Sequence, residues 1–145
     1  MNFNLYSRFH ESFAPVLEKP ALVDASGAGM TFGELDQLSA RFAALLRLHG
    51  VRREDRVVVQ VEKTMAAVAL YLACLRTGAI FVPLNTAYTP SEVDYFVGDA
   101  EPRLFVSVPD LRDPASPLWA EALRCNPDHD IVVSAPGDIL SLIHI

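Results

Sequence analysis

The chain has 145 residues, a hydrophobic fraction of 51% and a formal net charge of -6 at pH 7. This length suits one domain or part of one, and the acidic balance argues against non-specific nucleic-acid binding, which depends on clustered Lys and Arg. The longest apolar run, Met65–Leu75, falls short of the roughly 20 residues that cross a bilayer, so we expect a core helix and no membrane span.

The first residues predict a helix followed by a hairpin. Aromatic and apolar side chains across Phe3–Phe13 recur at helical spacings and stop before Pro15, which favours a short amphipathic helix laid on a larger body. Ala21–Asp24 is typical of a short strand, and Ser26–Gly29 is typical of the turn that leads it into a paired strand.

The clearest amphipathic helix comes next. Thr31 is followed three positions later by Glu34, so the hydroxyl and the carboxylate can each accept a hydrogen bond from an amide at a helix start. Gly50 is placed to end the helix. Its apolar positions recur at spacings of three and four, at Leu35, Leu38, Phe42, Leu45 and Leu46.

The middle of the chain predicts a strand, a helix and a second strand. Arg56–Val61 is rich in valine and too short for a helix, so it predicts a strand. The apolar stretch Met65–Arg76 predicts a helix, and Thr64 before it is a residue type that favours the N-cap position. Gly78 then turns the chain into a buried strand, Ala79–Leu84.

A second capping box predicts the next helix. Thr89 and Glu92 flank Pro90, which suits the first helical position, and the helix should run to about Ala100. The remaining expected elements are a strand over Leu104–Val108, a connector over 109–117, a helix over Leu118–Arg124 and a short strand over Ile131–Val133.

Strands and helices therefore alternate along the chain. This order predicts the α/β class, with a mainly parallel sheet and helices packed on its faces. A phospho-receiver domain shares this alternation, but it needs clustered acidic residues and a late lysine. Here only Asp24 ends an early strand, and Glu62, Lys63 and Asn85 follow the later strands.

No pattern of residues predicts a catalytic, cofactor-binding or metal site in this chain. Glu62 and Lys63 follow a strand, where α/β sheets place functional groups, but two charges that solvate a loop explain them as well. Asp128–Asp130 follows Asn-Pro and is typical of a turn. The histidines share no metal-ligand spacing with one another or with a cysteine: His10, His49, His129 and His144.

Nucleophilic and phosphate-binding motifs are equally missing from the sequence. No serine lies in a glycine-flanked elbow between a strand and a helix, and no glycine-rich loop is followed by Lys, since Gly27 and Gly29 precede Met30. Cys74 and Cys125 lie far apart and predict no disulfide framework. The first residues match neither a signal peptide nor a transit peptide, so we expect a cytoplasmic protein.

Several motifs together resemble a known family. Leu75–Asn85 joins the apolar helix to the buried strand through Gly78 and ends that strand at Pro83. With the other motifs between Thr31 and Arg103, it is similar to the N-terminal region of adenylate-forming (AMP-binding) acyl-CoA synthetases. The segments Gln60–Lys63 and Asn85–Tyr88 are most similar to malonyl-CoA synthetases. The other matching segments are Thr31–Leu35, Asp55–Val57, Asn85–Pro90 and Asp99–Arg103.

This resemblance implies an ATP-dependent acid–CoA ligase of the cytoplasm. A carboxylic acid such as malonate or a fatty acid would attack the α-phosphate of ATP, and the CoA thiol would then displace AMP from the acyl-adenylate. The full-length enzyme would use ATP, CoA and Mg²⁺. In this family the phosphate loop, the acid pocket, the ribose-binding aspartate and the catalytic lysine come later in the chain, so we expect none of these ligands to bind residues 1–145.

The two ends of the sequence lead to different expectations. We expect residues 1–139 to be an incomplete N-terminal part of the large domain of such an enzyme. Residues 140–145, Leu-Ser-Leu-Ile-His-Ile, are the translation of a common transposon mosaic-end adapter, and we expect a non-native tail there. The alternatives are a free-standing, non-catalytic α/β binding module and a fragment of a different adenylating enzyme, for fatty, aryl or amino acids.

Overall fold

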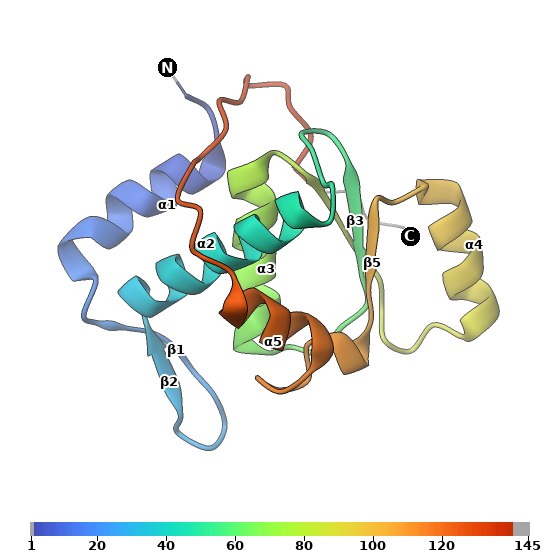
Figure 1. The fold of residues 1–145 in the computed structure, drawn as a ribbon, viewed down its shortest axis with the longest axis horizontal. Helices are drawn as coiled ribbons and strands as arrows, with labels where there is room; N and C mark the ends of the chain where they lie inside the picture. Colours follow the sequence, from blue (N-terminus) through green and yellow to red (C-terminus); the bar gives the residue numbers. More distant parts are fainter. Residues whose placement is uncertain (1, 141–145) are drawn as a thin grey trace.

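A three-stranded parallel sheet with helices on both faces forms the centre of the molecule (Figure 1). The structure is a computed structural model that describes residues 2–140. A separate two-stranded hairpin precedes the sheet. The elements are α1 Leu5–Phe13, η1 Ala14–Val16, β1 Pro20–Val23, β2 Gly29–Thr31, α2 Phe32–Leu48, β3 Arg56–Val59, α3 Met65–Thr77, β4 Ile80–Pro83, α4 Pro90–Ala100, β5 Leu104–Val106, η2 Val108–Asp110 and α5 Pro117–Arg124.

The strand order is β4-β3-β5, and both pairings are parallel. Val57 and Val59 of the central strand β3 face the main core with α2 and α3, whereas Val58 faces a second core on the other side, under α4. This alternation follows from the period of two in a strand. The predicted α/β class with a parallel sheet is confirmed, and Figure 1 shows α4 apart from the other helices.

Local signals in the sequence explain why the helices begin and end where they do. Thr31 and Glu34 form the predicted capping box of α2, and Thr89 forms the same arrangement with Glu92 at the start of α4. The Thr64 side chain accepts from the Ala67 amide at the start of α3. Gly78 ends α3 at a φ of 75°, in the left-handed region that favours glycine.

Helix α3 is apolar on nearly every side because it is enclosed. Helix α2 packs against it, α1 lies across it, and the sheet closes the remaining side. The largest fully buried side chains of this region include Phe42, Leu45 and Leu46 of α2 and Leu70 and Leu75 of α3. A helix that is apolar all round needs such an enclosed position.

The predicted strand over Ile131–Val133 is wrong. Residues 126–140, which we call the strap, form no helix or strand but run from α5 past α2 and α1 (Figure 1). The Val132 amide donates to the Arg76 carbonyl at 2.9 Å and its carbonyl accepts from Asn4 Nδ2 at 3.0 Å. These bonds to a helix end and a side chain replace the strand pairing that the apolar pattern predicted.

Three predicted strands are shorter in the structure. Strand β3 ends at Val59 and not at Val61, and β4 covers Ile80–Pro83 and not Ala79–Leu84. Strand β5 ends at Val106 because residues 108–110 form the short helix η2. The predicted tail, 140–145, lies outside the described residues except for Leu140, whose carbonyl accepts from the Phe81 amide at 2.9 Å. No helix within residues 2–140 has the length and apolar character needed to cross a membrane.

Candidate functional site

The carboxyl ends of the three parallel strands meet at one edge of the sheet, where α/β proteins bind ligands. The Gln60 amide donates to the Val106 carbonyl at 2.8 Å, and Gln60 Nε2 donates to the Asn85 carbonyl at 3.1 Å. Gln60 therefore joins the ends of all three strands. This places the motif that begins at Gln60 in a structural role at the edge.

The second motif, Asn85–Tyr88, is a turn. Asn85 Oδ1 accepts from the Ala87 amide at 2.9 Å and the Asn85 carbonyl accepts from the Tyr88 amide at 3.1 Å. An asparagine that bonds to its own backbone two residues on is the usual way to start such a turn. The turn leads directly to Thr89, the N-cap of α4.

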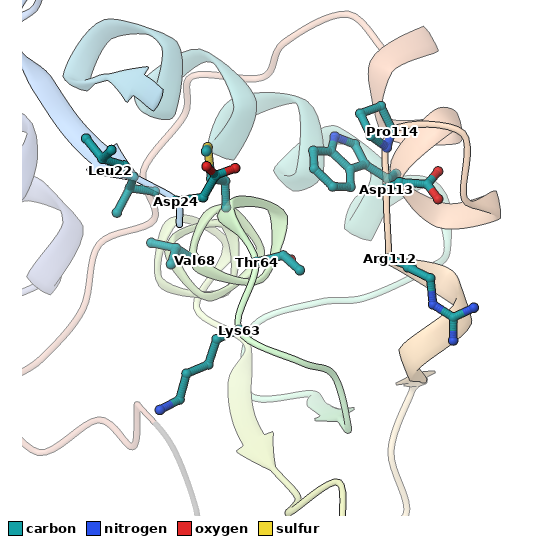
Figure 2. A pocket seen from close by; sticks show the side chains of 11 residues that line it. Leu22, Asp24, Lys63, Thr64, Val68, Arg112, Asp113 and Pro114 are labelled. Carbon is teal, nitrogen blue, oxygen red and sulfur yellow. The ribbon is translucent and has the colours of Figure 1, made fainter. Parts of the chain in front are cut away.

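A shallow cavity of about 470 Å³ opens beside this edge (Figure 2). Its walls come from the β1–β2 hairpin, the start of α3 and the segment that leads to α5. The apolar lining is Leu22, Val23, Met65, Val68, Pro114 and Trp119, and the polar lining is Asp24, Lys63, Thr64, Arg112 and Asp113.

The charged side chains of this cavity do not converge. Figure 2 shows Lys63 and Arg112 extending from opposite walls and away from each other, while Asp24 lies over the first turn of α3. The Ser26 hydroxyl, which donates to Asp24 at 2.6 Å, and the backbone amides of the turn hold the pKa of Asp24 below its usual range. The cavity can receive an apolar group, but it presents no aligned base, nucleophile or oxyanion site.

A buried polar cluster lies at the other end of α3 from this edge, around the fully buried Arg76 of its last turn. Its guanidinium pairs with the Asp36 carboxylate, donates to Ser39 Oγ at 3.0 Å and to the His129 carbonyl at 2.9 Å, and lies 4.1 Å from the centre of the Tyr6 ring. Tyr6 also bonds to Asp36. The cluster therefore ties α1, α2, α3 and the strap together.

Two ionisable groups of the core, Tyr6 and Cys74, are held in their neutral forms. Burial, together with the hydrogen bond to Asp36, raises the pKa of Tyr6 to about 12. Burial raises the pKa of the Cys74 thiol to about 12 as well. A nucleophilic cysteine needs a lowered pKa, so Cys74 is a packing residue.

Each of the three histidines that the structure describes lies near a carboxylate. His10 Nδ1 and His129 Nδ1 lie 3.5 Å and 3.8 Å from different oxygens of Asp36, and His49 Nε2 lies 3.0 Å from Glu121. The fourth histidine, His144, lies outside the described residues. Among residues 2–140, no group of three or more His, Cys, Asp or Glu is arranged to hold a metal ion.

Glu62 and Lys63 take different positions at the edge of the sheet. Both are exposed, and Lys63 lines the rim of the cavity whereas Glu62 does not. Sequence reasoning missed the cluster around Arg76. The available signal was a single arginine in an otherwise apolar helix, which requires buried partners wherever the helix is enclosed on all sides.

Comparison with known proteins places this arrangement in a family. Nonribosomal peptide synthetase nlsA of Emericella nidulans is 36% identical over 101 residues, which are 70% of this chain and 2% of nlsA. Probable CoA ligase CCL9 of Humulus lupulus is 26% identical over 136 residues, which are 94% of this chain and 25% of that protein.

Solved structures of MatB from Rhodopseudomonas palustris share the fold at 31% identity. The apo form has a TM-score of 0.86 and the match covers 99% of this chain, while the ATP-bound form has a TM-score of 0.85 and the match covers 97%. In both cases the matched region is 32% of the MatB chain. The chain thus spans a third or less of these relatives.

The sequence profile of the AMP-binding enzyme family matches residues 9–139. That range contains the parallel sheet, its capped helices and most of the strap. The chain belongs to the AMP-binding enzyme family.

Proposed function

We propose that the chain is the N-terminal part of an ATP-dependent acid–CoA ligase that activates a small carboxylic acid, with malonate as the first candidate. The observation that carries this proposal is the likeness to MatB, a malonyl-CoA synthetase, along nearly the whole chain at 31% identity. Malonate is also supported by the two segments that are most similar to malonyl-CoA synthetases, Gln60–Lys63 and Asn85–Tyr88.

In this proposal the residues described here form a scaffold. The carboxyl edge of the sheet, where Gln60 bonds to Asn85, would support the nucleotide and acid sites that the rest of the enzyme contributes. ATP, CoA and Mg²⁺ would bind to that longer protein, which we place in the cytoplasm. An ATP-bound form of a protein with the same fold over this region supports ATP as the nucleotide.

We also propose that residues 1–139 are native and that residues 140–145 come from a sequencing adapter. The test is long-read sequencing of the source DNA from the codon for Ile139 onward. A frame that continues into a Gly/Ser/Thr-rich loop with a lysine supports both proposals. A stop codon directly after Ile145 would instead support a free-standing binding module.

A second candidate is an amino-acid adenylating enzyme, which the 36% identity to nlsA favours. The complete reading frame, once expressed, separates the two in an ATP–pyrophosphate exchange assay. A panel of malonate, a hydroxybenzoate, a fatty acid and several amino acids serves as substrates. Exchange with malonate above the other acids supports our proposal, whereas exchange with an amino acid alone supports the second candidate.

A further inference from the structure

A second groove lies between α2 and α5, which pack against each other. We call it the α2–α5 groove. Its volume is about 550 Å³, within the range of roughly 300–1,000 Å³ that is usual for small-molecule sites. All of its lining residues lie inside the range that the family profile matches, residues 9–139. They are Met30, Gly33, Glu34, Gln37, Leu38, Arg41, Pro114, Trp119 and Leu123.

Most of this lining is apolar and is held in place by the fold. Leu38 is buried and Met30 packs against the main core. Trp119 and Leu123 lie four residues apart in α5 and therefore share one face of that helix. Leu123 is nevertheless 44% exposed. The groove therefore offers apolar and aromatic surface that the described part of the chain does not cover.

Two charged side chains at this groove are already bonded. Glu34 Oε1 accepts from the Thr31 amide at 3.1 Å in the capping box of α2. Arg41 Nη1 donates to the Leu123 carbonyl at 3.1 Å and to the Cys125 carbonyl at 2.6 Å. These bonds fix both side chains to the ends of the two helices. The groove thus has one charge of each sign, so its lining favours no net charge in a ligand.

Two other polar groups of the groove remain available. The side-chain amide of Gln37 and the indole N–H of Trp119 make no hydrogen bond with any residue of the described part of the chain. Both side chains are partly buried. The amide of Gln37 can donate and accept, whereas the indole of Trp119 can only donate.

We propose that the α2–α5 groove binds a neutral, planar aromatic molecule that carries one hydrogen-bonding edge, the class to which aromatic amides belong. The ring lies against the indole of Trp119 and the apolar side chains of Met30 and Leu38, and its polar edge bonds to Gln37. An aromatic ring gains more against an indole than an aliphatic group of the same size does. This site does not depend on the proposed ligase activity.

Titration of the 145-residue chain with benzamide, followed by ¹H–¹⁵N NMR, tests this proposal. Trp119 is the only tryptophan of the chain, so its indole N–H gives a single signal. We expect this signal and the side-chain amide signals of Gln37 to shift together and to saturate at millimolar benzamide.

Related compounds test each part of the ligand class. Benzoate and benzamidine keep the planar shape of benzamide but carry a negative and a positive charge, and both should bind more weakly. Cyclohexanecarboxamide keeps the amide but lacks the planar ring. It should bind about two- to tenfold more weakly, which is the usual contribution of an aromatic pair.

Substitutions assign the binding to this groove and not to the cavity of Figure 2, which Trp119 also lines. Gln37→Leu removes the hydrogen-bonding partner and should weaken benzamide binding about two- to tenfold. Val68→Ala is the matched control, because Val68 lines the other cavity and not this groove. It should leave the affinity for benzamide unchanged.

Three results would overturn the proposal. The first is the absence of a saturable shift at Trp119 and Gln37 with benzamide. The second is tighter binding of benzoate or benzamidine than of benzamide, which would exclude a neutral ligand. The third is an affinity that Val68→Ala lowers and Gln37→Leu does not, which would place the ligand in the other cavity.

Discussion

Arg76 is the residue on which the packing of the helices depends most. Its side chain is fully buried, and no buried polar side-chain atom among the described residues lacks a hydrogen-bond partner. A buried cation costs several kcal/mol to desolvate, and here an aspartate, a serine hydroxyl, a tyrosine and a backbone carbonyl together offset that cost. Removing one member leaves the others buried without their partner.

Arg76→Met should therefore lower the free energy of unfolding by about 3–5 kcal/mol, the usual effect of breaking a buried ion pair. Urea denaturation monitored by circular dichroism measures the change. Adding Asp36→Leu to this variant should recover part of the loss, because the unpaired carboxylate is then gone. Arg52→Met, at an exposed arginine, is the control. A loss below about 1 kcal/mol for Arg76→Met would contradict this reading.

Tyr6 makes the free energy of unfolding depend on pH in the alkaline range. Its folded pKa of about 12 lies above the ordinary 10.0, so the folded state favours the protonated phenol. That contribution is complete below about pH 10 and is lost as the pH rises through 12, with a total of roughly 2–3 kcal/mol. Unfolding curves from pH 9 to 11.5 should show this decline in the wild type.

The matched variants for this pH effect are Tyr6→Phe and Tyr95→Phe. Tyr6→Phe removes the titrating group and should flatten the decline between pH 10 and 11.5. Tyr95 is 69% exposed, so Tyr95→Phe should leave the decline as it is in the wild type. An equally steep decline in Tyr6→Phe would show that a different group causes it.

At the scale of elements, alanine substitutions at three glycines distinguish the cost of backbone strain from the cost of steric crowding. Gly78 has a φ of 75°, and a Cβ there would lie 2.9 Å from Val132 Cγ2 and 3.1 Å from Arg53 Cγ. Gly50 has a φ of 81° but open space around it, and Gly98 lies in α4 with open space and no positive φ. Comparison of one alanine substitution at each position therefore distinguishes left-handed strain from steric crowding.

Thermal or urea unfolding of these variants should give three distinct results. Gly50→Ala should cost about 1–2 kcal/mol from left-handed strain alone. Gly78→Ala should cost more than Gly50→Ala because the strain is combined with a clash against the strap. Gly98→Ala should stabilise α4 by about 0.5–1 kcal/mol. Equal costs at positions 50 and 78 would mean that the strap yields to the added methyl group without loss.

Elements with local signals could be predicted from the sequence, and the strap could not. The capping boxes at Thr31 and Thr89 and the glycine at position 78 fix helix ends through neighbouring residues. The strap depends on bonds to Ala40, Arg76 and Asn4, which are distant in sequence. An apolar triplet such as Ile131–Val133 predicts a strand unless those partners are known.

The same reasoning applies to the candidate site. The sequence places Glu62, Lys63 and Asn85 after strands, and parallel strands bring their carboxyl ends to one edge. The predicted strand ran through Gln60 to Val61, so the bond from Gln60 to the Asn85 carbonyl could not be predicted. The cavity beside this edge could not be predicted, because it needs Trp119 and Pro114 from a segment some 50 residues beyond Lys63 to lie against α3. Neither feature supplies a reacting group.

At the scale of the whole molecule, our proposal makes the chain a scaffold for sites that the rest of the enzyme contributes. Its sheet is covered on both faces, and its carboxyl edge has two cations that point apart and no glycine-rich phosphate loop. An enzyme built on it needs the sites that the longer relatives carry elsewhere. We therefore propose, as the central claim, that this scaffold is the N-terminal part of an acid–CoA ligase.

The most direct test is to express the complete reading frame, incubate it with malonate, ATP, Mg²⁺ and CoA, and measure AMP and malonyl-CoA by mass spectrometry. The 145-residue chain alone serves as the control. We predict equal amounts of AMP and malonyl-CoA from the complete protein and neither product from the short chain. ATP turnover without any acyl-CoA, across malonate and other carboxylic acids, would contradict the claim.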